Sequence, residues 1–179
     1  MRSLQDAVGR ELLWKPRSLL SRTHDLVDPE AGDGEPYATL VWRPGFLWRG
    51  PAEAQSGDGR WFFRPRGFFR ESVIVLAQDG AAPLAMLRRH FRRAVLRFED
   101  GSREFVWRRE SFWSTVWRFE DGNGTAVLRL RTQFPLLRSK ARVEIESSSA
   151  PAADRALLAC LGWHLVLMAR RRAAAHGAG

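Results

Sequence analysis

Hydrophobic and polar residues alternate through most of the stretch between residues 11 and 149. In the segment Arg93–Gly101, for example, Ala94, Leu96 and Phe98 fall on one face. A period of two places alternate side chains on opposite faces of a strand, so the pattern indicates strands that are buried on one side. The clearest predicted strands are Tyr37–Arg43, Gly59–Pro65, Phe68–Gln78, Leu84–Phe91, Arg93–Gly101, Arg103–Arg109, Phe112–Asp121 and Thr125–Phe134. Shorter alternations occur at Glu11–Lys15, Ser18–Thr23, Asp25–Asp28 and around Val143 and Ile145.

Two Asp-Gly pairs, Asp100-Gly101 and Asp121-Gly122, separate neighbouring predicted strands. Asp-Gly favours a tight hairpin because glycine adopts a positive φ at little cost. The five residues that end at each glycine are the same, Arg-Phe-Glu-Asp-Gly. The chain is therefore predicted to form an antiparallel meander of similar hairpins.

An uncharged, almost wholly apolar run, Ala156–Ala169, follows the predicted strands. Its 14 residues span roughly 21 Å as a helix, whereas a membrane-spanning helix must cross about 30 Å. Asp154 before the run and Arg170–Arg172 after it suit the two ends of a helix dipole. The sequence therefore predicts a helix over residues 152–171 that is buried on all sides. The side chains expected in the core are Leu157, Leu158, Leu161, Trp163, His164, Leu165 and Leu167.

A large antiparallel sheet and one apolar helix combine in few ways. A sheet of about ten or more strands curls, and closure removes its exposed edges. A barrel of that size is too wide for its own side chains to fill, so something else must occupy the interior. We therefore expect a mainly β protein, a closed antiparallel barrel around a buried hydrophobic C-terminal α-helix. The expected domain covers residues 11–171, with strands over 11–149, an N-terminal extension over 1–10 and a flexible tail over 172–179.

Several local motifs resemble the tubby C-terminal-like superfamily. They are the strand Gly59–Phe63, the segment Arg66–Phe69, the pair Phe112-Trp113 and the helical pattern Leu157–Trp163. That superfamily includes the phospholipid scramblases and the plant LURP-one-related proteins. The resemblance implies a closed barrel of about twelve strands around a central helix. In tubby proteins, basic residues on the barrel surface bind phosphoinositide headgroups, but no motif here places those residues one by one. The cysteine-rich and acidic calcium-binding segments of animal scramblases do not occur in this sequence.

Positive charge is in excess, with 29 Lys and Arg against 20 Asp and Glu and a pI near 11.3. Such a balance suggests anionic partners, although Arg-rich composition without a site and a solvated basic face are the alternatives. The candidate lipid- or anion-binding residues form two clusters: Arg88, Arg89, Arg92 and Arg93, and then Arg138, Lys140 and Arg142. The second cluster continues the first only if their strands are neighbours. The expected partner is anionic phospholipid, bound from the cytoplasm at the inner membrane face.

Two other functions are compatible with the sequence. The terminal run can be a membrane anchor over residues 153–169, in which case Arg170–Arg172 stay in the cytoplasm and the barrel lies outside the cell. Charge and aromatic content also suggest nucleic acid, and Arg66–Arg70 has a faint likeness to an RNA-recognition strand. The aromatic residues, including Trp113 and Trp117, fall on alternating positions, so they are expected to point into the barrel. Nucleic acid is therefore an unlikely partner.

Motifs of enzymes and metal sites are missing from the sequence. The four histidines lack metal-ligand spacing, and no nucleophile elbow, phosphate-binding loop or dinucleotide fingerprint occurs. Asp121–Thr125 stops short of a calcium loop and stands where a hairpin turn is expected. The single Cys160 lies in the apolar run, so it is expected to be buried and inert. Met1–Arg10 has no stretch of signal-peptide type. No catalytic residue, cofactor or metal is predicted.

Overall fold

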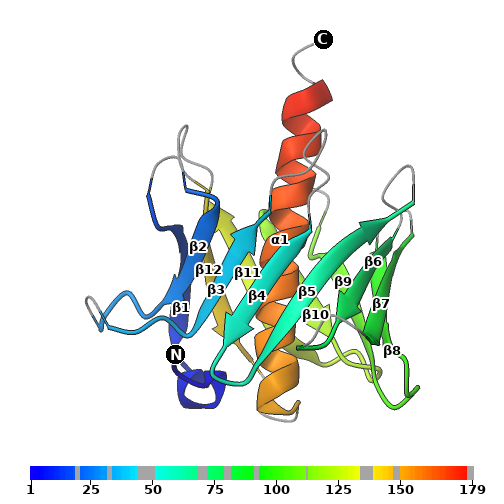
Figure 1. Ribbon diagram of the computed structural model, residues 1–179, viewed down its shortest axis with the longest axis horizontal. Helices are drawn as coiled ribbons and strands as arrows, with labels where there is room; N and C mark the ends of the chain where they lie inside the picture. The colour runs from blue at the N-terminus through cyan, green and yellow to red at the C-terminus, as the bar shows by residue number, and fades with distance from the viewer. Residues whose placement is uncertain are drawn as a thin grey trace.

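The protein is a closed barrel of twelve antiparallel strands in a computed structural model (Figure 1). The structure describes residues 1–18, 21–31, 34–43, 51–67, 72–78, 82–90, 93–111, 113–133, 139–146 and 150–176. The strands are β1 (Glu11–Pro16), β2 (Thr23–Val27), β3 (Ala38–Trp42), β4 (Ala52–Ser56), β5 (Gly59–Arg66), β6 (Ser72–Leu76), β7 (Pro83–Arg89), β8 (Arg93–Phe98), β9 (Glu104–Arg109), β10 (Val116–Glu120), β11 (Ala126–Gln133) and β12 (Lys140–Ile145). A short 3-10 helix, η1 (Leu4–Ala7), precedes them and one helix, α1 (Ala152–His176), follows. The predicted fold class is confirmed.

Each strand pairs with the next strand in the chain, and β1 closes the barrel against β12. In that closing pair Leu12 lies opposite Val143, and both side chains are fully buried. Closure gives the first and last strands of the meander a partner each, which removes the edges that an open sheet exposes. The meander therefore alternates between two ends: an upper end, where the C-terminus lies in Figure 1, and a lower end, where α1 begins.

The strand predictions fail in three places. β4 was not predicted, because its inward residues Ala52, Ala54 and Ser56 are too small to give a strong alternation. β2 is one strand, Thr23–Val27, so Asp25–Asp28 is not a separate strand. Ser18–Thr23 is not one either, because its described residues before Thr23 are not in a strand and residues 19 and 20 lie outside the described residues.

The predicted strand Phe112–Asp121 is also too long. β10 begins only at Val116, so Trp117 and Phe119 point inward as expected, but Trp113 precedes the strand and is exposed. The prediction that Trp113 points into the barrel, made from its alternation with Trp117, is therefore wrong.

The two Asp-Gly hairpins use glycine differently. Gly101 has a φ of +69°, as the Asp-Gly pair predicts. In the second hairpin the positive φ, +79°, falls on Gly124 and not on Gly122. There Asp121 accepts hydrogen bonds on Oδ1 from the backbone N–H groups of Asn123 and Thr125, both at 2.9 Å. The Asp121 side chain therefore organises the second turn.

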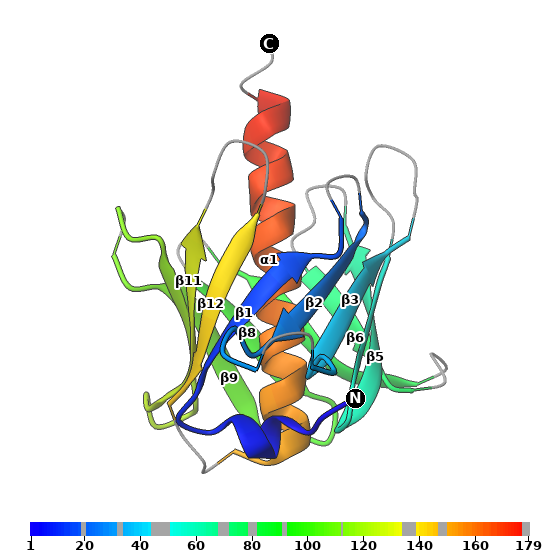
Figure 2. The same cartoon turned by 90° about the vertical axis from the view of Figure 1, so that its left-hand side faces the viewer.

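Helix α1 runs along the barrel axis, with its C-terminal end projecting beyond the upper end (Figures 1 and 2). The apolar run is enclosed by the strands, and the seven residues expected in the core have exposed fractions between 0 and 5%. Residues 172–176 continue the helix, so the expected flexible tail was wrong over that stretch. Burial of these side chains excludes water from an interior that the strands alone would leave unfilled.

Gly162 sets how closely α1 approaches the barrel wall. A Cβ atom at this position would lie 3.1 Å from Leu130 Cδ1, 3.2 Å from Trp107 Cζ3 and 3.3 Å from Phe119 Cε2. These distances are shorter than ordinary van der Waals contacts. A larger residue at position 162 would therefore push the helix away from β9, β10 and β11.

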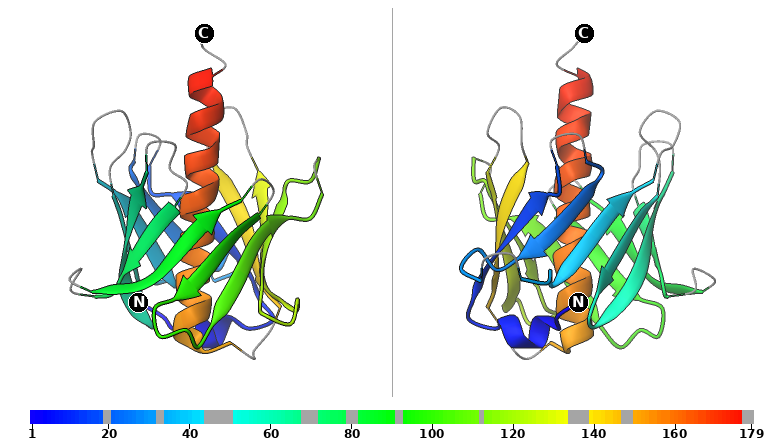
Figure 3. Two further views of the ribbon diagram at one scale, coloured as in Figure 1. Left: turned by 90° about the vertical axis from the view of Figure 1, so that its right-hand side faces the viewer. Right: turned by 60° about the vertical axis from the view of Figure 1, so that its left-hand side comes forward.

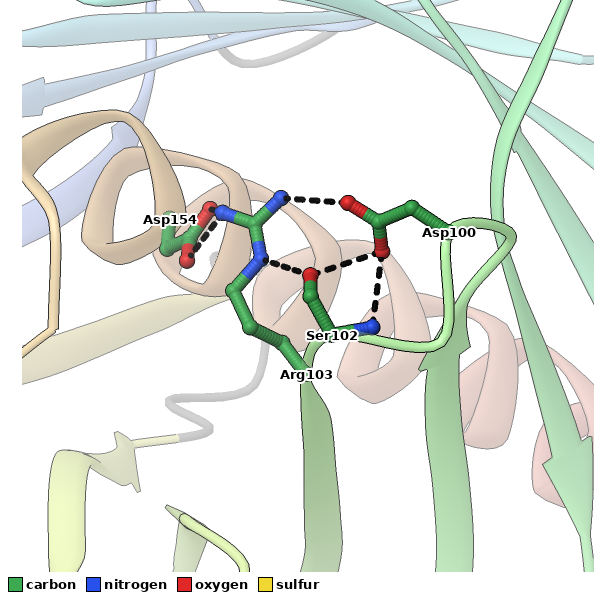
Figure 4. A network of polar contacts seen from close by, with 4 residues as sticks. All are labelled: Asp100, Ser102, Arg103 and Asp154. Carbon is green, nitrogen blue, oxygen red and sulfur yellow. Dashed lines mark hydrogen bonds and ion pairs between the residues drawn. The ribbon is translucent and has the colours of Figure 1, made fainter.

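An ion-pair network fixes the lower end of α1 to the β8–β9 hairpin (Figure 4). Arg103 donates from Nη1 to both carboxylate oxygens of Asp154 at 2.7 Å and packs its guanidinium 4.0 Å from the Phe98 ring centroid. Asp100 accepts from the backbone N–H and the hydroxyl of Ser102, which in turn accepts from Arg103 Nε. The buried carboxylate of Asp154 thus receives its counter-charge from a strand hairpin.

The N-terminal segment closes the same lower end. Leu4 and Ala7 of η1 are fully buried against the core, and the Leu4 N–H donates to Asp58 Oδ2 at 2.7 Å. Figures 1 and 2 show η1 beside the start of α1 at the lower end. Residues 1–10, expected as an extension, are therefore part of the packed domain.

Replacement of Gly162 by Leu should destabilise the protein, because the added side chain overpacks the contact with Trp107 and Phe119. Overpacking costs about 1–3 kcal/mol, or a fall in Tm of roughly 5–10 °C for a domain of this size. The matched control is Ala174→Leu on the same helix, where the side chain is exposed. Thermal unfolding followed by circular dichroism checks this, and equal Tm values for both variants would refute the packing role.

Removal of Arg103 should cost much more than removal of Arg97 on the same hairpin. Arg103→Ala leaves Asp154, whose side chain is 5% exposed, without its counter-ion, and such a break costs about 3–5 kcal/mol. Arg97 is 73% exposed and pairs with Glu104, so Arg97→Ala should cost about 0–1 kcal/mol.

The Arg103→Ala variant should also respond to acid in a characteristic way. Burial raises the pKa of Asp154, and Arg103 opposes that rise. A carboxyl with a raised folded-state pKa stabilises the fold as pH falls, since the folded state then binds more protons. Urea unfolding should therefore show the variant regaining stability relative to wild type between pH 7 and pH 5. A constant difference across this range would contradict the assignment.

Candidate functional site

Basic residues gather at the upper end of the barrel. Figure 3 shows that α1 emerges at this end. The loops after β1, β3, β5, β7, β9 and β11 all turn at this end, because the strands are antiparallel and consecutive. We use the name basic rim for nine residues at or near these turns. They are Lys15, Arg22, Arg64, Arg66, Arg88, Arg89, Arg93, Arg131 and Lys140.

The basic rim differs from the rest of the surface in how its charge is balanced. Among the described residues, none of its nine members forms an ion pair with Asp or Glu. Two other arginines near the upper end do: Arg17 with Asp25 at 2.9 Å and Arg43 with Glu53 at 2.7 Å. The pKa of Glu53 is lowered by its hydrogen bond from Arg43. The rim therefore carries positive charge that the described acidic side chains do not neutralise.

Carboxylates concentrate at the lower end. There Asp28 pairs with Arg10 at 3.1 Å, Asp154 pairs with Arg103, and Glu35 pairs with the N-terminal amine. The two ends of the barrel therefore differ: these carboxylates at the lower end are paired, whereas the nine residues of the basic rim have no described carboxylate partner.

The first predicted cluster is divided by the barrel wall. Arg88 and Arg93 are exposed and face outward on adjacent strands; Arg88 lies opposite Val95, two residues along from Arg93. Arg89 follows Ala85 and Leu87 in the alternation, so it faces inward, and burial lowers its pKa. Arg92 lies outside the described residues. The structure therefore brings Arg88 and Arg93 together on the outer face and places Arg89 at the mouth of the barrel.

The second predicted cluster does not adjoin the first. Strands β9, β10 and β11 lie between β8 and β12, so the two clusters are not on neighbouring strands. Lys140 and Arg142 face outward on β12, and Arg142 forms an ion pair with Glu11. Arg138 lies outside the described residues. Of this cluster, Lys140 belongs to the basic rim and Arg142 to the compensated wall.

A row of four arginines crosses the outer wall between the two clusters. Arg93, Arg108, Arg118 and Arg129 lie opposite one another in turn on β8, β9, β10 and β11. Like charges directly opposite on neighbouring strands repel. Three glutamates form ion pairs with the last three arginines at 2.7–2.8 Å. Glu120 pairs with both Arg108 and Arg118, and Arg129 pairs with both Glu110 and Glu146. This row is therefore a structural network, and Arg93 is its one member that belongs to the rim.

Sequence reasoning missed Lys15, Arg22, Arg64, Arg66 and Arg131. They lie beside three different turns at the upper end, those after β1, β5 and β11, and no two of them are adjacent in the sequence, so they form no basic run. A signal was nevertheless present: in a meander, every second turn lies at the same end of the barrel. Counting charges by alternate turns would have gathered these residues into one group.

Aromatic rings and histidines fill the interior around α1. His164 stacks on Trp42, with ring centroids 4.6 Å apart, and Trp163 stacks on Trp14 at 6.1 Å. Arg171 covers the outer side of this group, with its guanidinium 4.2 Å from the Trp42 ring centroid. His24 contacts the edge of Trp163 at 5.5 Å. Rings pack the interior around this part of α1, which leaves the ends of the barrel as the places where a ligand can bind.

Two further groups inside the barrel, His24 and Cys160, have shifted pKa values. Burial lowers the pKa of His24 to about 4, and the positive charge of Arg171 acts in the same direction against the opposing effect of Asp25. Burial raises the pKa of the Cys160 thiol, which keeps it protonated. In the described part of the chain, no three His, Cys, Asp or Glu side chains lie close enough to hold a metal ion.

A hollow of about 540 Å³ lies at the lower end, away from the basic rim. Its lining residues are Gly9, Arg10, Glu11, Asp28, Pro29, Glu30 and Ala31. Two of these residues, Arg10 and Asp28, pair with each other at 3.1 Å. None of the predicted binding residues lines this hollow.

Comparison of this chain with protein families, with curated proteins and with solved structures found no match. By length and composition, Ala152–Ala174 of α1 would suffice to cross a membrane, but 83% of its most apolar stretch is buried inside the barrel. The charge pattern of the surface is therefore the main guide to function.

His24 should make the fold sensitive to mild acid. Its pKa falls from an ordinary 6.5 to about 4 on folding, so the unfolded chain takes up a proton at higher pH than the folded one. Stability is thus complete above about pH 6.5 and is lost as pH falls towards 4. The loss attributable to His24 is about 2–3 kcal/mol at pH 4.5.

Urea unfolding at pH 7 and pH 4.5 measures this loss. The His24→Gln variant should lose less stability than wild type between the two values. His90→Gln, at an exposed position beyond β7, is the control and should keep the wild-type difference. Identical pH dependence in wild type and His24→Gln would rule out the assignment.

Proposed function

We propose that this protein is a non-enzymatic barrel that binds anionic phospholipid headgroups through the basic rim. One observation carries the proposal: nine basic side chains gather at one end, and no described carboxylate pairs with them. The same chain supplies carboxylate partners to arginines on the wall and at the lower end. An external anion is the natural counter-charge for the rim.

Phospholipid suits the rim for chemical and geometric reasons. Guanidinium groups form paired hydrogen bonds with phosphate oxygens, and each basic residue near an anionic leaflet contributes about 1 kcal/mol. The rim residues are spread around the mouth of a barrel on six or more strands. A flat surface that carries many phosphates can reach several of them at once, whereas a single small anion reaches one or two.

The resemblance to the tubby-like superfamily supports the same function. Its members are expected to have a closed barrel around a central helix, and tubby proteins bind phosphoinositide headgroups through basic surface residues. The burial of α1 supports a peripheral association over a membrane-spanning one. If α1 left the barrel for a bilayer, the inward rings of Trp14, Trp42 and Phe63 would lose their packing partners.

Replacing Arg88 and Arg93 by Ser should weaken binding to vesicles of phosphatidylglycerol and phosphatidylcholine. At about 1 kcal/mol for each residue, the double variant should bind roughly 30-fold more weakly. Replacing all four residues Arg88, Arg89, Arg92 and Arg93 should abolish sedimentation with the vesicles. Higher salt should release the wild-type protein, because the attraction is screened.

The control for net charge is the double variant Arg60→Ser and Arg97→Ser. Both residues are outward-facing and exposed at the lower end, and the pair removes the same charge. Sedimentation of this variant should match wild type. An equal loss in both double variants would mean that only overall charge matters, and no vesicle binding by wild type would refute the proposed function.

A further inference from the structure

The upper end also carries an exposed indole. Trp113 lies in the β9–β10 loop and is 88% exposed, and it is the one exposed aromatic side chain among the described residues. Five other described tryptophans are no more than 5% exposed: Trp14, Trp42, Trp61, Trp107 and Trp163. Exposure of the Trp113 ring to water, in contrast to these five buried tryptophans, costs free energy in apolar surface.

The loop that carries Trp113 is held by hydrogen bonds. The Ser114 N–H donates to the Ser111 carbonyl at 3.2 Å, and the Val116 N–H donates to Ser114 Oγ at 2.9 Å. Thr115 is tied to β11, since its carbonyl accepts from the Thr132 hydroxyl at 2.8 Å and from the Thr132 N–H at 2.9 Å. The indole is therefore presented from a formed turn.

Positive charge lies beside this turn. Arg109, the last residue of β9, holds its guanidinium 4.7 Å from the Trp117 ring centroid. Arg93 stands opposite Arg108 at the same end of β8 and β9. Arg170–Arg172 lie on the part of α1 at the upper end (Figure 3). An exposed apolar ring at the same end of the barrel as these basic groups matches the boundary of an anionic bilayer, where phosphates lie directly above acyl chains.

We infer that Trp113 is a membrane anchor, whose indole enters the bilayer interface while the basic rim binds the phosphates above it. This inference rests on the proposed function. Tryptophan favours the interface because its ring is apolar and its N–H still reaches polar groups. Charge alone does not distinguish a lipid surface from a soluble polyanion, but an exposed indole gains free energy only where an apolar medium is present. Trp113 thus makes the lipid bilayer itself the partner.

The test compares Trp113→Ala with wild type on two ligands: phosphatidylglycerol–phosphatidylcholine vesicles and soluble inositol hexakisphosphate. Loss of one buried indole should weaken vesicle binding by about tenfold or more. Binding to inositol hexakisphosphate should not change, because the phosphate contacts remain. Trp113→Phe should recover much of the vesicle binding. Val8→Ala is the control, since Val8 is an exposed apolar residue, 41% exposed, at the lower end.

Fluorescence locates the indole directly. On vesicles of lipids brominated in the acyl chain, the tryptophan emission of wild type should be lower than on vesicles of unbrominated lipids. The emission of Trp113→Phe should be the same on both kinds of vesicle.

The outcomes separate the two ideas. Unchanged vesicle binding by Trp113→Ala would overturn the anchor and leave the rim proposal standing. Equal losses on both ligands would also overturn the anchor, because they would give Trp113 a structural role in the rim. If wild type binds inositol hexakisphosphate but not vesicles, Trp113 is not an anchor and the ligand is a soluble polyanion. If wild type binds neither ligand, the proposed function itself fails.

Discussion

Burial of α1 inside the barrel is the interaction on which the rest of the structure depends. Twelve strands enclose a space wider than their own side chains can fill, and the helix is apolar on all sides. Neither part can exist alone in water, because the barrel would hold an empty apolar interior and the helix would expose its whole surface. Gly162 allows close approach on one side, and stacked rings such as Trp42 and His164 fill the wider space on another.

A filled interior determines where chemistry can occur. Many barrels bind ligands in a central cavity, but here α1 and the inward rings occupy that position. The lower end is closed by η1 and by the Arg103–Asp154 network, in which charges are paired. The upper end is the place where positive charge is left over and where an indole is exposed. The two ends therefore differ because η1 and paired charges cover the core at the lower end, whereas the upper end carries the basic residues without a described carboxylate partner.

The fold was largely predictable because its signals are periodic. Alternation with a period of two marks strands, and a long uncharged run marks a buried helix, even where the residues are read one segment at a time. β4 escaped because alanine and serine give little contrast with glutamate and glutamine on the other face. Trp113 was misplaced because alternation continues into a turn where no strand exists.

The candidate site was harder to predict because it is assembled from distant turns. Arg88 and Arg93 are close in sequence and share a face, but Arg89 points the other way, as its position next to Arg88 on a strand requires. Arg22, Arg64 and Arg131 lie far apart in the sequence and come to the same end of the molecule only when the barrel forms. Ion pairing also decides which arginines remain available, and the partners of Arg118 and Arg129 lie on other elements.

The order of elements has a consequence for how this chain folds. The closing pair joins Leu12 to Val143, so nearly the whole strand region must exist before the sheet can close. The helix that fills the interior follows all twelve strands in the chain. During synthesis the strands therefore emerge before their core does, and contacts so distant in sequence form slowly. A nascent or truncated chain that lacks α1 would expose its inward rings, which makes this protein dependent on prompt completion and on protection from aggregation until the helix arrives.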